Sequence, residues 1–462
     1  MNEKCSCVAV PKRYLMMALV IIGVQVVIWQ TVSYTAYCVK WKDYFPYQQK
    51  EPFVYSHLVG LLLSLLPASL VSVGYGANRV FGASLLTLSV LLEVAPLAIH
   101  LGIHGLAGAQ FLNGAAEGFL VTSLYGVLAD WTPVDERTTT FAILTSTTLL
   151  GGRCMFEAIE FEFVTSPVIF ANVTLGLAWF VLWYLLFFDD PYHNKSVTEA
   201  ERLRITEGNG RAFSSSSQAH CVPWRQILRS TPVHLVCLCV AAGMAEQRLG
   251  KYNYLMYLGG VTSFPALSSV LALAAAVVTC GVVSDLLRDK GWLSTTGSRR
   301  LTCTGGLIIH ACATMLQGLK ENHWIEHIAM TALGVFVVGI ETSHVDMAPR
   351  HAPVIKALSA TTLEVVLGGI NLFVIADASS LTGHRLAHVF IPVAQVVAAL
   401  LYLLYGRADV QPWDEHEEQS PRQEQRDGCE NYDDVCNTQK KDCNDGGAPQ
   451  AQCSQRDIEE AV

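Results

Sequence analysis

The chain has 462 residues, of which 51% are hydrophobic and only 15% are charged. The charged residues fall between long apolar runs and near the C-terminus, so the composition excludes a water-soluble globular protein and indicates an integral membrane protein. The formal net charge of −9 owes much to the acidic stretch from Asp414 to Glu418 and carries no information about a substrate.

Long apolar runs recur along the whole chain. About 20 consecutive apolar residues are needed to cross a hydrocarbon core of about 30 Å. The sequence predicts about twelve such spans, with six on each side of a polar interval. They cover residues 15–37, 54–73, 80–100, 106–128, 138–158, 164–188, 233–258, 264–283, 301–319, 325–343, 357–376 and 386–405.

These spans divide the chain into an N-terminal segment (1–14), a six-helix half (15–188), a hinge (189–230), a second six-helix half (231–406) and a tail (407–462). In the hinge, Ser196 and Glu199 have the spacing of a capping box, which predicts a short amphipathic helix. The tail has almost no apolar residues, so we expect it to be disordered.

Basic residues favour one side of the predicted membrane protein. Lys and Arg collect in cytoplasmic loops. With twelve spans, most of them fall on the side that also holds both chain ends, so we expect both termini to be cytoplasmic. The residues are Lys12, Arg13, Arg79, Arg137, the six between Lys195 and Arg229, those between Arg288 and Arg300, Arg350 and Lys356.

Several short motifs occur in register with the spans. They are Ala77-Asn78-Arg79-Val80-Phe81-Gly82, Glu117-Gly118, Trp131-x-Pro133-x-x-Glu136-Arg137, Val222-Pro223-Trp224, Leu293-Ser294-Thr295-Thr296, His344-x-Asp346-x-Ala348-Pro349-Arg350 and Gln411-Pro412-Trp413. In order and spacing these motifs resemble the anion and phosphate transporter family of the major facilitator superfamily, which includes sialin and the vesicular glutamate transporters. The resemblance is strongest to the vesicular glutamate transporters.

The resemblance implies an all-α membrane protein with about twelve transmembrane helices in two six-helix halves. It also implies a secondary active transporter of organic anions, with glutamate transport into vesicles as the first expectation. Sialic acid or phosphate transport is the alternative within the family. A divergent member that has lost transport and acts as a membrane scaffold is the alternative outside it.

The expected substrate-binding residues depart from the family pattern. Gln30 or Thr31 stands where the family has an arginine in its first helix, and Gln110 replaces the arginine of the fourth. Arg248 is a candidate to have taken over anion binding, because a planar guanidinium grips a carboxylate with two hydrogen bonds. The alternative is that its span ends early and Arg248 is solvated. Arg153 is a further candidate, although an internal ion pair with Glu157, four residues later, is the favoured explanation.

Charges at membrane depth need a partner or a water-filled cavity, because insertion costs at least about 2.5 kcal/mol for each. Glu117 matches the family's glutamate, and the resemblance implies a role in proton coupling. His57 could titrate in an acidic vesicle, whereas its structural alternative is a packing hydrogen bond. We expect Asp285 with Arg288, and Asp346 with Arg350, to act as cytoplasmic gating latches.

The expected partners are a small anionic substrate, the lipid bilayer and protons, with chloride or sodium as further candidate ions. We expect a monomer with no cofactor, no metal and no nucleic acid partner. An enzyme is not expected, because no nucleophile–base or metal-ligand constellation has usable spacing. The expected location is a synaptic or secretory vesicle membrane, with the plasma membrane and the lysosome as alternatives.

Overall fold

The computed structural model describes residues 11–40, 50–160, 166–187, 191, 194, 197–206, 222–257, 267–319, 323–376 and 381–414. In several stretches within helices the structure describes the backbone but not the side chains; these stretches include 153–160, 246–257 and 371–376. All described residues belong to one compact unit, residues 1–415. The tail was predicted to be disordered, and its residues after 414 lie outside the described ones.

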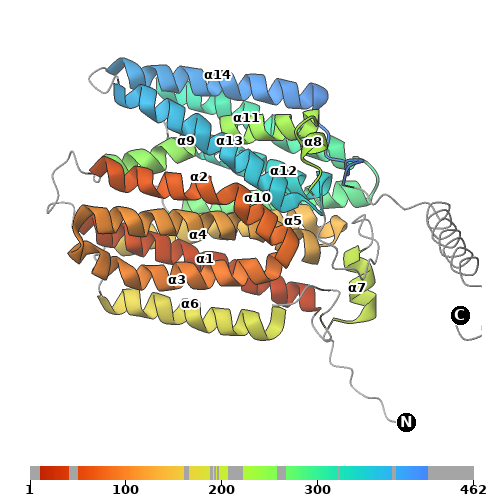
Figure 1. The fold of residues 1–462 in the computed structure, drawn as a ribbon. Helices are drawn as coiled ribbons and strands as arrows, with labels where there is room; N and C mark the ends of the chain where they lie inside the picture. The colour runs from red at the N-terminus through yellow and green to blue at the C-terminus, as the bar shows by residue number, and fades with distance from the viewer. Residues whose placement is uncertain are drawn as a thin grey trace, which may run out of the picture. The chain divides into compact units, whose positions relative to one another are not determined.

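The described residues form twelve long helices, the shortest of 22 and the longest of 30 residues. Each predicted span overlaps one of them (Figure 1). They are α1 Lys12–Lys40, α2 Lys50–Tyr75, α3 Ala77–His100, α4 Gly102–Trp131, α5 Arg137–Glu160, α6 Ser166–Phe187, α9 Thr231–Tyr257, α10 Leu267–Asp289, α11 Thr295–Leu319, α12 His323–Met347, α13 Ala352–Ala376 and α14 Leu381–Tyr405. Three short helices lie between them, namely η3 Val134–Glu136, α7 Glu199–Thr206 and α8 Trp224–Ile227.

Most of these helices extend beyond the apolar spans into polar sequence, because backbone hydrogen bonds continue a helix without apolar side chains. By length and apolar content, the described parts of six helices are sufficient to cross a membrane. Four further helices, α3, α6, α9 and α14, have shorter apolar described stretches. Large apolar side chains on the outer faces are exposed, including Leu63, Leu185 and Leu404, as expected of surfaces that face lipid.

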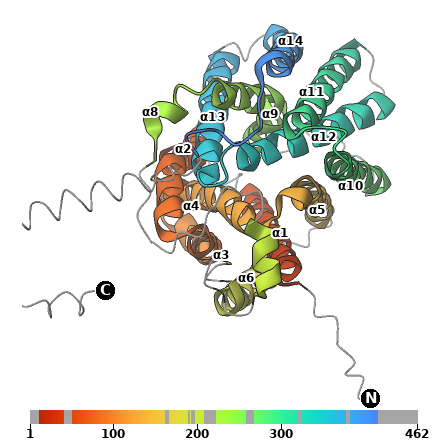
Figure 2. The same ribbon diagram turned by 90° about the vertical axis from the view of Figure 1, so that its right-hand side faces the viewer.

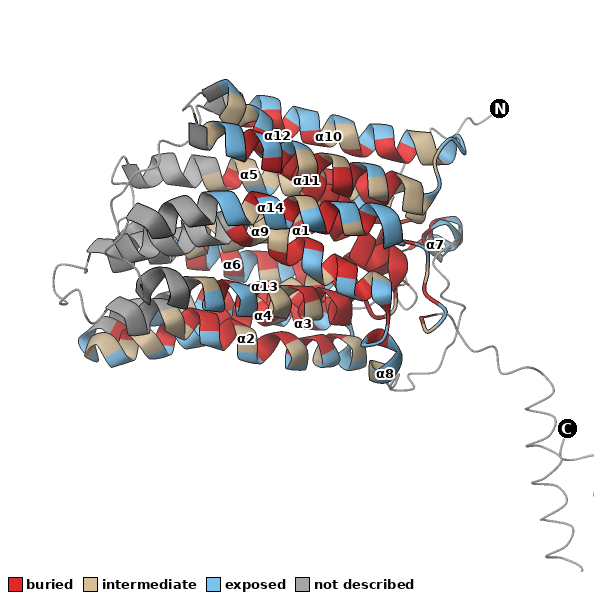
Figure 3. Cartoon of the chain, turned by 90° about the horizontal axis from the view of Figure 1, so that it is seen from above, coloured by how far each residue is buried: buried red, intermediate tan, exposed pale blue. Residues whose placement is uncertain are grey.

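Each six-helix half packs around its own core. In the first half α2 and α3 both pack against α4, and α1 packs against α5 and α6; in the second half α11 packs against α12 and α14, and α9 against α13 (Figure 2). Buried and exposed residues alternate along helices such as α2 and α10, so each helix has an inner and an outer face (Figure 3). Two large hydrophobic clusters follow this division, one drawn mainly from each half.

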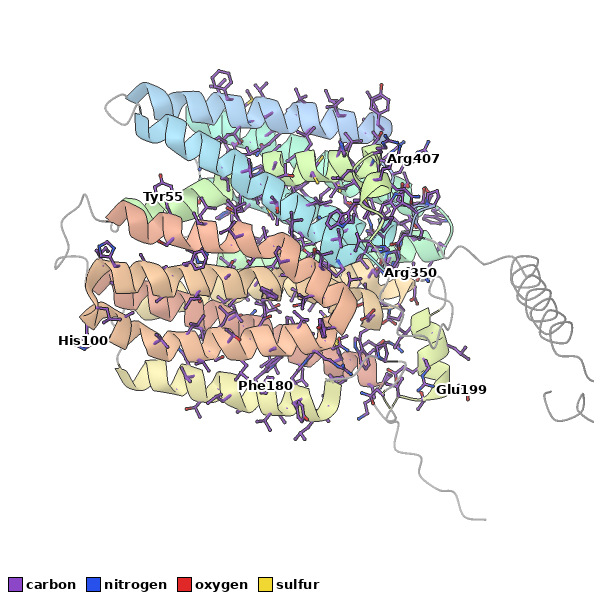
Figure 4. The ribbon with its side chains drawn as sticks, viewed as in Figure 1. Tyr55, His100, Phe180, Glu199, Arg350 and Arg407 are labelled. Carbon is purple, nitrogen blue, oxygen red and sulfur yellow. The ribbon has the colours of Figure 1, made fainter. Side chains whose placement is uncertain are left out.

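The two halves meet through α5 against α10 and α12, and through α13 against α2 and α4. Buried polar contacts join them at one end of the bundle, where the α2–α3, α4–α5, α10–α11 and α12–α13 connections lie. We call this end the closed end. In Figure 4 it carries Arg350 and Arg407, whereas His100 lies at the opposite end.

The helix predicted in the hinge is present as α7 at the closed end. The backbone N–H of Glu201 donates to the hydroxyl oxygen of Thr198 at 3.3 Å, so Thr198 caps this helix. Ser196, the predicted cap, lies outside the described residues. The Glu201 carboxylate accepts the backbone N–H of Arg13 at 2.8 Å and Ile205 is fully buried, which fixes α7 against the first half.

Candidate functional site

Glycines bring α2 and α4 into close contact. A methyl group added to Gly114 would overlap the carbonyl oxygen of His57, and one added to Gly118 would overlap the Ser64 hydroxyl. Gly60 of α2 meets the backbone of Phe111 in the same way. Small residues at four-residue spacing are a common way for membrane helices to approach closely. The glycines of α4 therefore allow α2 to approach closely enough for side chains of the two helices to form hydrogen bonds.

This close approach pairs the two predicted proton-coupling residues. His57 Nε2 lies 3.1 Å from Glu117 Oε2, and their side chains are 11% and 17% exposed. His57 Nδ1 is buried and has no hydrogen-bond partner among the described residues. Two ionisable groups within hydrogen-bond reach can share or exchange a proton, so the arrangement has the chemistry that the prediction requires.

Asp346 bridges the two halves at the closed end. Its carboxylate lies 3.1 Å from Arg137 Nη1 of α5 and 2.8 Å from Arg299 Nε of α11. Arg299 also donates to the hydroxyl of Thr138 at 2.8 Å. The side chains of Arg137, Arg299 and Asp346 are at most 2% exposed, so this is a buried charged network across the interface between the halves.

Asp285 makes a second link between the halves. It accepts hydrogen bonds from the backbone N–H groups of Thr138 and Thr139, at 3.3 Å and 2.7 Å, and from the Thr139 hydroxyl at 2.8 Å. A carboxylate from α10 thus caps the N-terminus of α5, where the helix dipole favours a negative charge. Arg288 lies 3.3 Å from Asp285 and donates to the Val134 carbonyl oxygen, so the predicted pair spans the same interface.

Arg350, the last predicted gating residue, lies where the chain after α14 returns to the α12–α13 connection. Its backbone N–H donates to the Asp414 carboxylate at 3.1 Å, and His351 Nδ1 lies 2.6 Å from the same carboxylate. The backbone N–H of Gln411 donates to the carbonyl oxygen of Met347 at 2.9 Å. The Gln-Pro-Trp motif therefore belongs to the closed end.

A third buried group was not singled out from the sequence. Lys356 Nζ of α13 lies 2.8 Å from both carboxylate oxygens of Glu341 in α12. Tyr125 of α4 donates to Glu341 Oε2 at 2.5 Å, and His344 Nδ1 lies 3.3 Å from the same oxygen. Glu341 falls within the predicted span 325–343, so its charge at membrane depth was the signal that could have revealed it.

The five predicted substrate-binding residues lie on four helices, α1, α4, α5 and α9. Gln30 Nε2 of α1 donates to the Ser89 hydroxyl at 2.8 Å and to the Asn172 carbonyl oxygen at 3.3 Å, between α3 and α6. Thr31 follows it and is half-buried, and Gln110 is buried in α4. The backbones of Arg153 and Arg248 lie in α5 and α9, and both side chains are outside the described ones.

The family model for the Major Facilitator Superfamily matches residues 53–376. The chain belongs to the Major Facilitator Superfamily. The predicted fold class, an all-α membrane protein with the fold of this superfamily, is confirmed.

Curated superfamily members with sequence similarity to the chain include vesicular glutamate transporters. It is 25% identical to vesicular glutamate transporter 3 of Danio rerio over 78% of this chain and 64% of the relative. It is likewise 25% identical to vesicular glutamate transporter 2 of Mus musculus over 78% of this chain and 65% of the relative. The chain thus matches slightly less than two thirds of the length of these relatives.

Solved superfamily structures share the fold at low sequence identity. The proton:xylose symporter XylE matches with a TM-score of 0.62 at 11% identity, over 87% of this chain and 98% of that one. The transporter FucP in its outward conformation matches with a TM-score of 0.54 at 12% identity, over 85% of this chain and 97% of that one. At this identity the matches establish the superfamily fold alone.

Proposed function

We propose that this superfamily member is a secondary active transporter of organic anions, with glutamate as its first substrate. The similarity to vesicular glutamate transporters supports the substrate class. The observation that carries the transport mechanism is the buried network of Arg137, Asp346 and Arg299 across the two halves. Such a network closes one end of the pathway and can be broken when that end opens.

The position of these contacts supports transport by alternating access. The charged groups of Asp346 and Asp285 are satisfied by partners from the opposite half, so the closed end is held by ion pairs and hydrogen bonds. Removal of one partner from a buried pair costs about 3–5 kcal/mol. Separation of the halves costs less, because water then replaces the lost partners. Asp346 was predicted to pair with Arg350, but its ion pairs are with Arg137 and Arg299, and the backbone N–H of Arg350 donates to Asp414. In this proposal Asp285, Arg288, Asp346 and Arg350 are all parts of one reversible latch.

Proton coupling is assigned to the His57–Glu117 pair, which lies within the first half and not at the latch. Substrate anion and proton then bind to different parts of the protein. Membrane potential is the second driving force, since moving one charge is worth about 2.3 kcal/mol per 100 mV. Arg248, Arg153, Gln30, Thr31 and Gln110 remain the proposed substrate-binding residues.

The proposed orientation places the closed end in the cytoplasm. Arg137, Arg204, Arg288 and Arg299 all lie at that end, in agreement with the preference of basic residues for the cytoplasmic side. Both termini are then cytoplasmic. The proposed location is a secretory or synaptic vesicle membrane, with the plasma membrane and the lysosome as alternatives.

Uptake of labelled glutamate by purified protein in liposomes tests this function, with membrane potential and pH gradient imposed separately. We expect uptake when the interior is positive, and a further response to the pH gradient. Uptake of sialic acid or phosphate in place of glutamate would support the alternative substrates. If intact liposomes accumulated none of the three, transport would be excluded in favour of the scaffold function.

A further inference from the structure

The Glu341–Lys356 pair is buried beside the interface between the two halves. Both residues belong to the second half, and the ammonium of Lys356 contacts both carboxylate oxygens at 2.8 Å. The pair therefore moves as one electrically neutral unit when the halves rotate against each other. His344 belongs to the same half and is held by Ser359, whose hydroxyl lies 2.8 Å from its Nε2.

Tyr125 of the first half contacts both members of this pair. Its hydroxyl donates to Glu341 at 2.5 Å, and the centroid of its ring lies 4.7 Å from Lys356 Nζ. An ammonium has three donors, and two of them are engaged by Glu341. The aromatic ring covers the ammonium as a cation–π partner. A residue of the opposite half thus contacts both charged groups.

Opening of the closed end removes this cover. Glu341 precedes Asp346 in α12 by five residues, which places it about 7.5 Å deeper in the bundle at a rise of 1.5 Å per residue. When Arg137 separates from Asp346, α4 and α5 leave together with the first half, and Tyr125 leaves with them. A carboxylate and an ammonium then face the opened pathway side by side.

We propose that this exposed pair binds the head group of an α-amino acid, with Lys356 on its carboxylate and Glu341 on its ammonium. A ligand with only a carboxylate would take Lys356 and leave Glu341 without its counter-charge, which is costly in a low-dielectric site. A zwitterionic head group supplies an opposite charge to each side chain. The ion pair between Glu341 and Lys356 is then replaced by two ion pairs with the ligand. The inference rests on the proposed anion transport and adds which residues recognise the amino and carboxylate groups of the substrate.

The test compares uptake of labelled glutamate with that of labelled glutarate, which has the same two carboxylates without the amino group. The ratio of the two uptake efficiencies does not depend on how much protein is folded. For the wild type we expect glutamate to be favoured by about tenfold or more, the effect of one charge-assisted hydrogen bond. In E341Q we expect this preference to fall about tenfold, mainly through a higher KM for glutamate.

The matching variants separate recognition from packing. K356Q removes the carboxylate partner, so we expect KM to rise for both compounds, and K356R should restore both. A structural role for the pair would instead lower glutamate and glutarate uptake equally in E341Q, and an unchanged ratio would overturn the inference. Equal transport of both compounds by the wild type would also overturn it while leaving anion transport intact. A wild type that carries neither would remove glutamate as the proposed substrate and the inference with it, and the sialic acid and phosphate assays would then decide whether anion transport stands.

Discussion

The charge on Glu117 is the single property most directly tied to the proposed energy coupling. Glu117→Gln keeps the size of the side chain and its contact with His57, but an amide cannot exchange a proton. We expect uptake driven by membrane potential to persist and the response to an imposed pH gradient to be lost. The measurement is the rate of glutamate uptake in one liposome preparation, once with only a membrane potential imposed and once with only a pH gradient imposed.

Glu364 provides a matched control for this substitution, because it is another buried glutamate, in α13 of the second half. We expect Glu364→Gln to retain the response to the pH gradient even if it lowers the yield of folded protein. A full response to the pH gradient in Glu117→Gln would show that the proton binds elsewhere.

The close contact of α2 with α4 makes a prediction about stability. In Gly114→Ala the new methyl group meets the carbonyl oxygen of His57, which is backbone and cannot rotate away. The helices must separate, and overpacking of this kind costs about 1–3 kcal/mol. We expect a lower thermal unfolding midpoint in detergent and, because His57 moves relative to Glu117, a weaker response to the pH gradient.

Gly108 lies in the same helix, and a methyl group added there meets nothing within 4 Å. Gly108→Ala should therefore keep or slightly raise the unfolding midpoint, since alanine stabilises a helix by up to about 1 kcal/mol relative to glycine. Equal midpoints for Gly114→Ala and Gly108→Ala would contradict the role of Gly114 in α2–α4 packing.

The buried network around Asp346 makes a prediction about the equilibrium between the closed and open states of the transporter. Asp346→Asn leaves Arg137 and Arg299 buried without their shared counter-charge, and this destabilises the closed end relative to an open one. We expect a cysteine introduced at the fully buried Ala142 of α5 to react several-fold faster with a membrane-impermeant thiol reagent in this variant. The measured quantity is the labelling rate above that of the same protein without the added cysteine.

Asp409→Asn is the control for this experiment, because Asp409 is exposed and accepts a hydrogen bond from Thr296 of the second half at 2.8 Å, without contact to the first half in that bond. Its labelling rate at the introduced cysteine should equal that of the wild type. If Asp346→Asn also left the rate unchanged, the network around Asp346 would not control opening of the closed end.

The positions of the helices could be predicted from the sequence because apolar length is a local property. A run of about 20 apolar residues specifies a span wherever it lies in the chain, and all twelve predicted spans overlap helices. The helix ends were less well defined, since polar residues such as Arg137 and Asp289 continue a helix without an apolar signal. The hinge helix was also predicted, from its capping pattern and amphipathic sequence.

Pairing of charges could be predicted only where the partners lie close in sequence. Asp285 and Arg288 are one turn apart in α10, and their ion pair is present. The contact of Asp346 with Arg137 spans 209 residues and depends on how α5 packs against α12, which no local pattern encodes.

The sequence by itself determined that this is a membrane protein with about twelve apolar spans and the motifs of a transporter family, because span length and motif spacing are read along one chain. The tertiary structure decided which ionisable groups meet. His57 reaches Glu117 because glycines let α2 and α4 approach, and Glu341 meets Tyr125 because the two halves are closed upon each other. Both contacts are products of packing between helices.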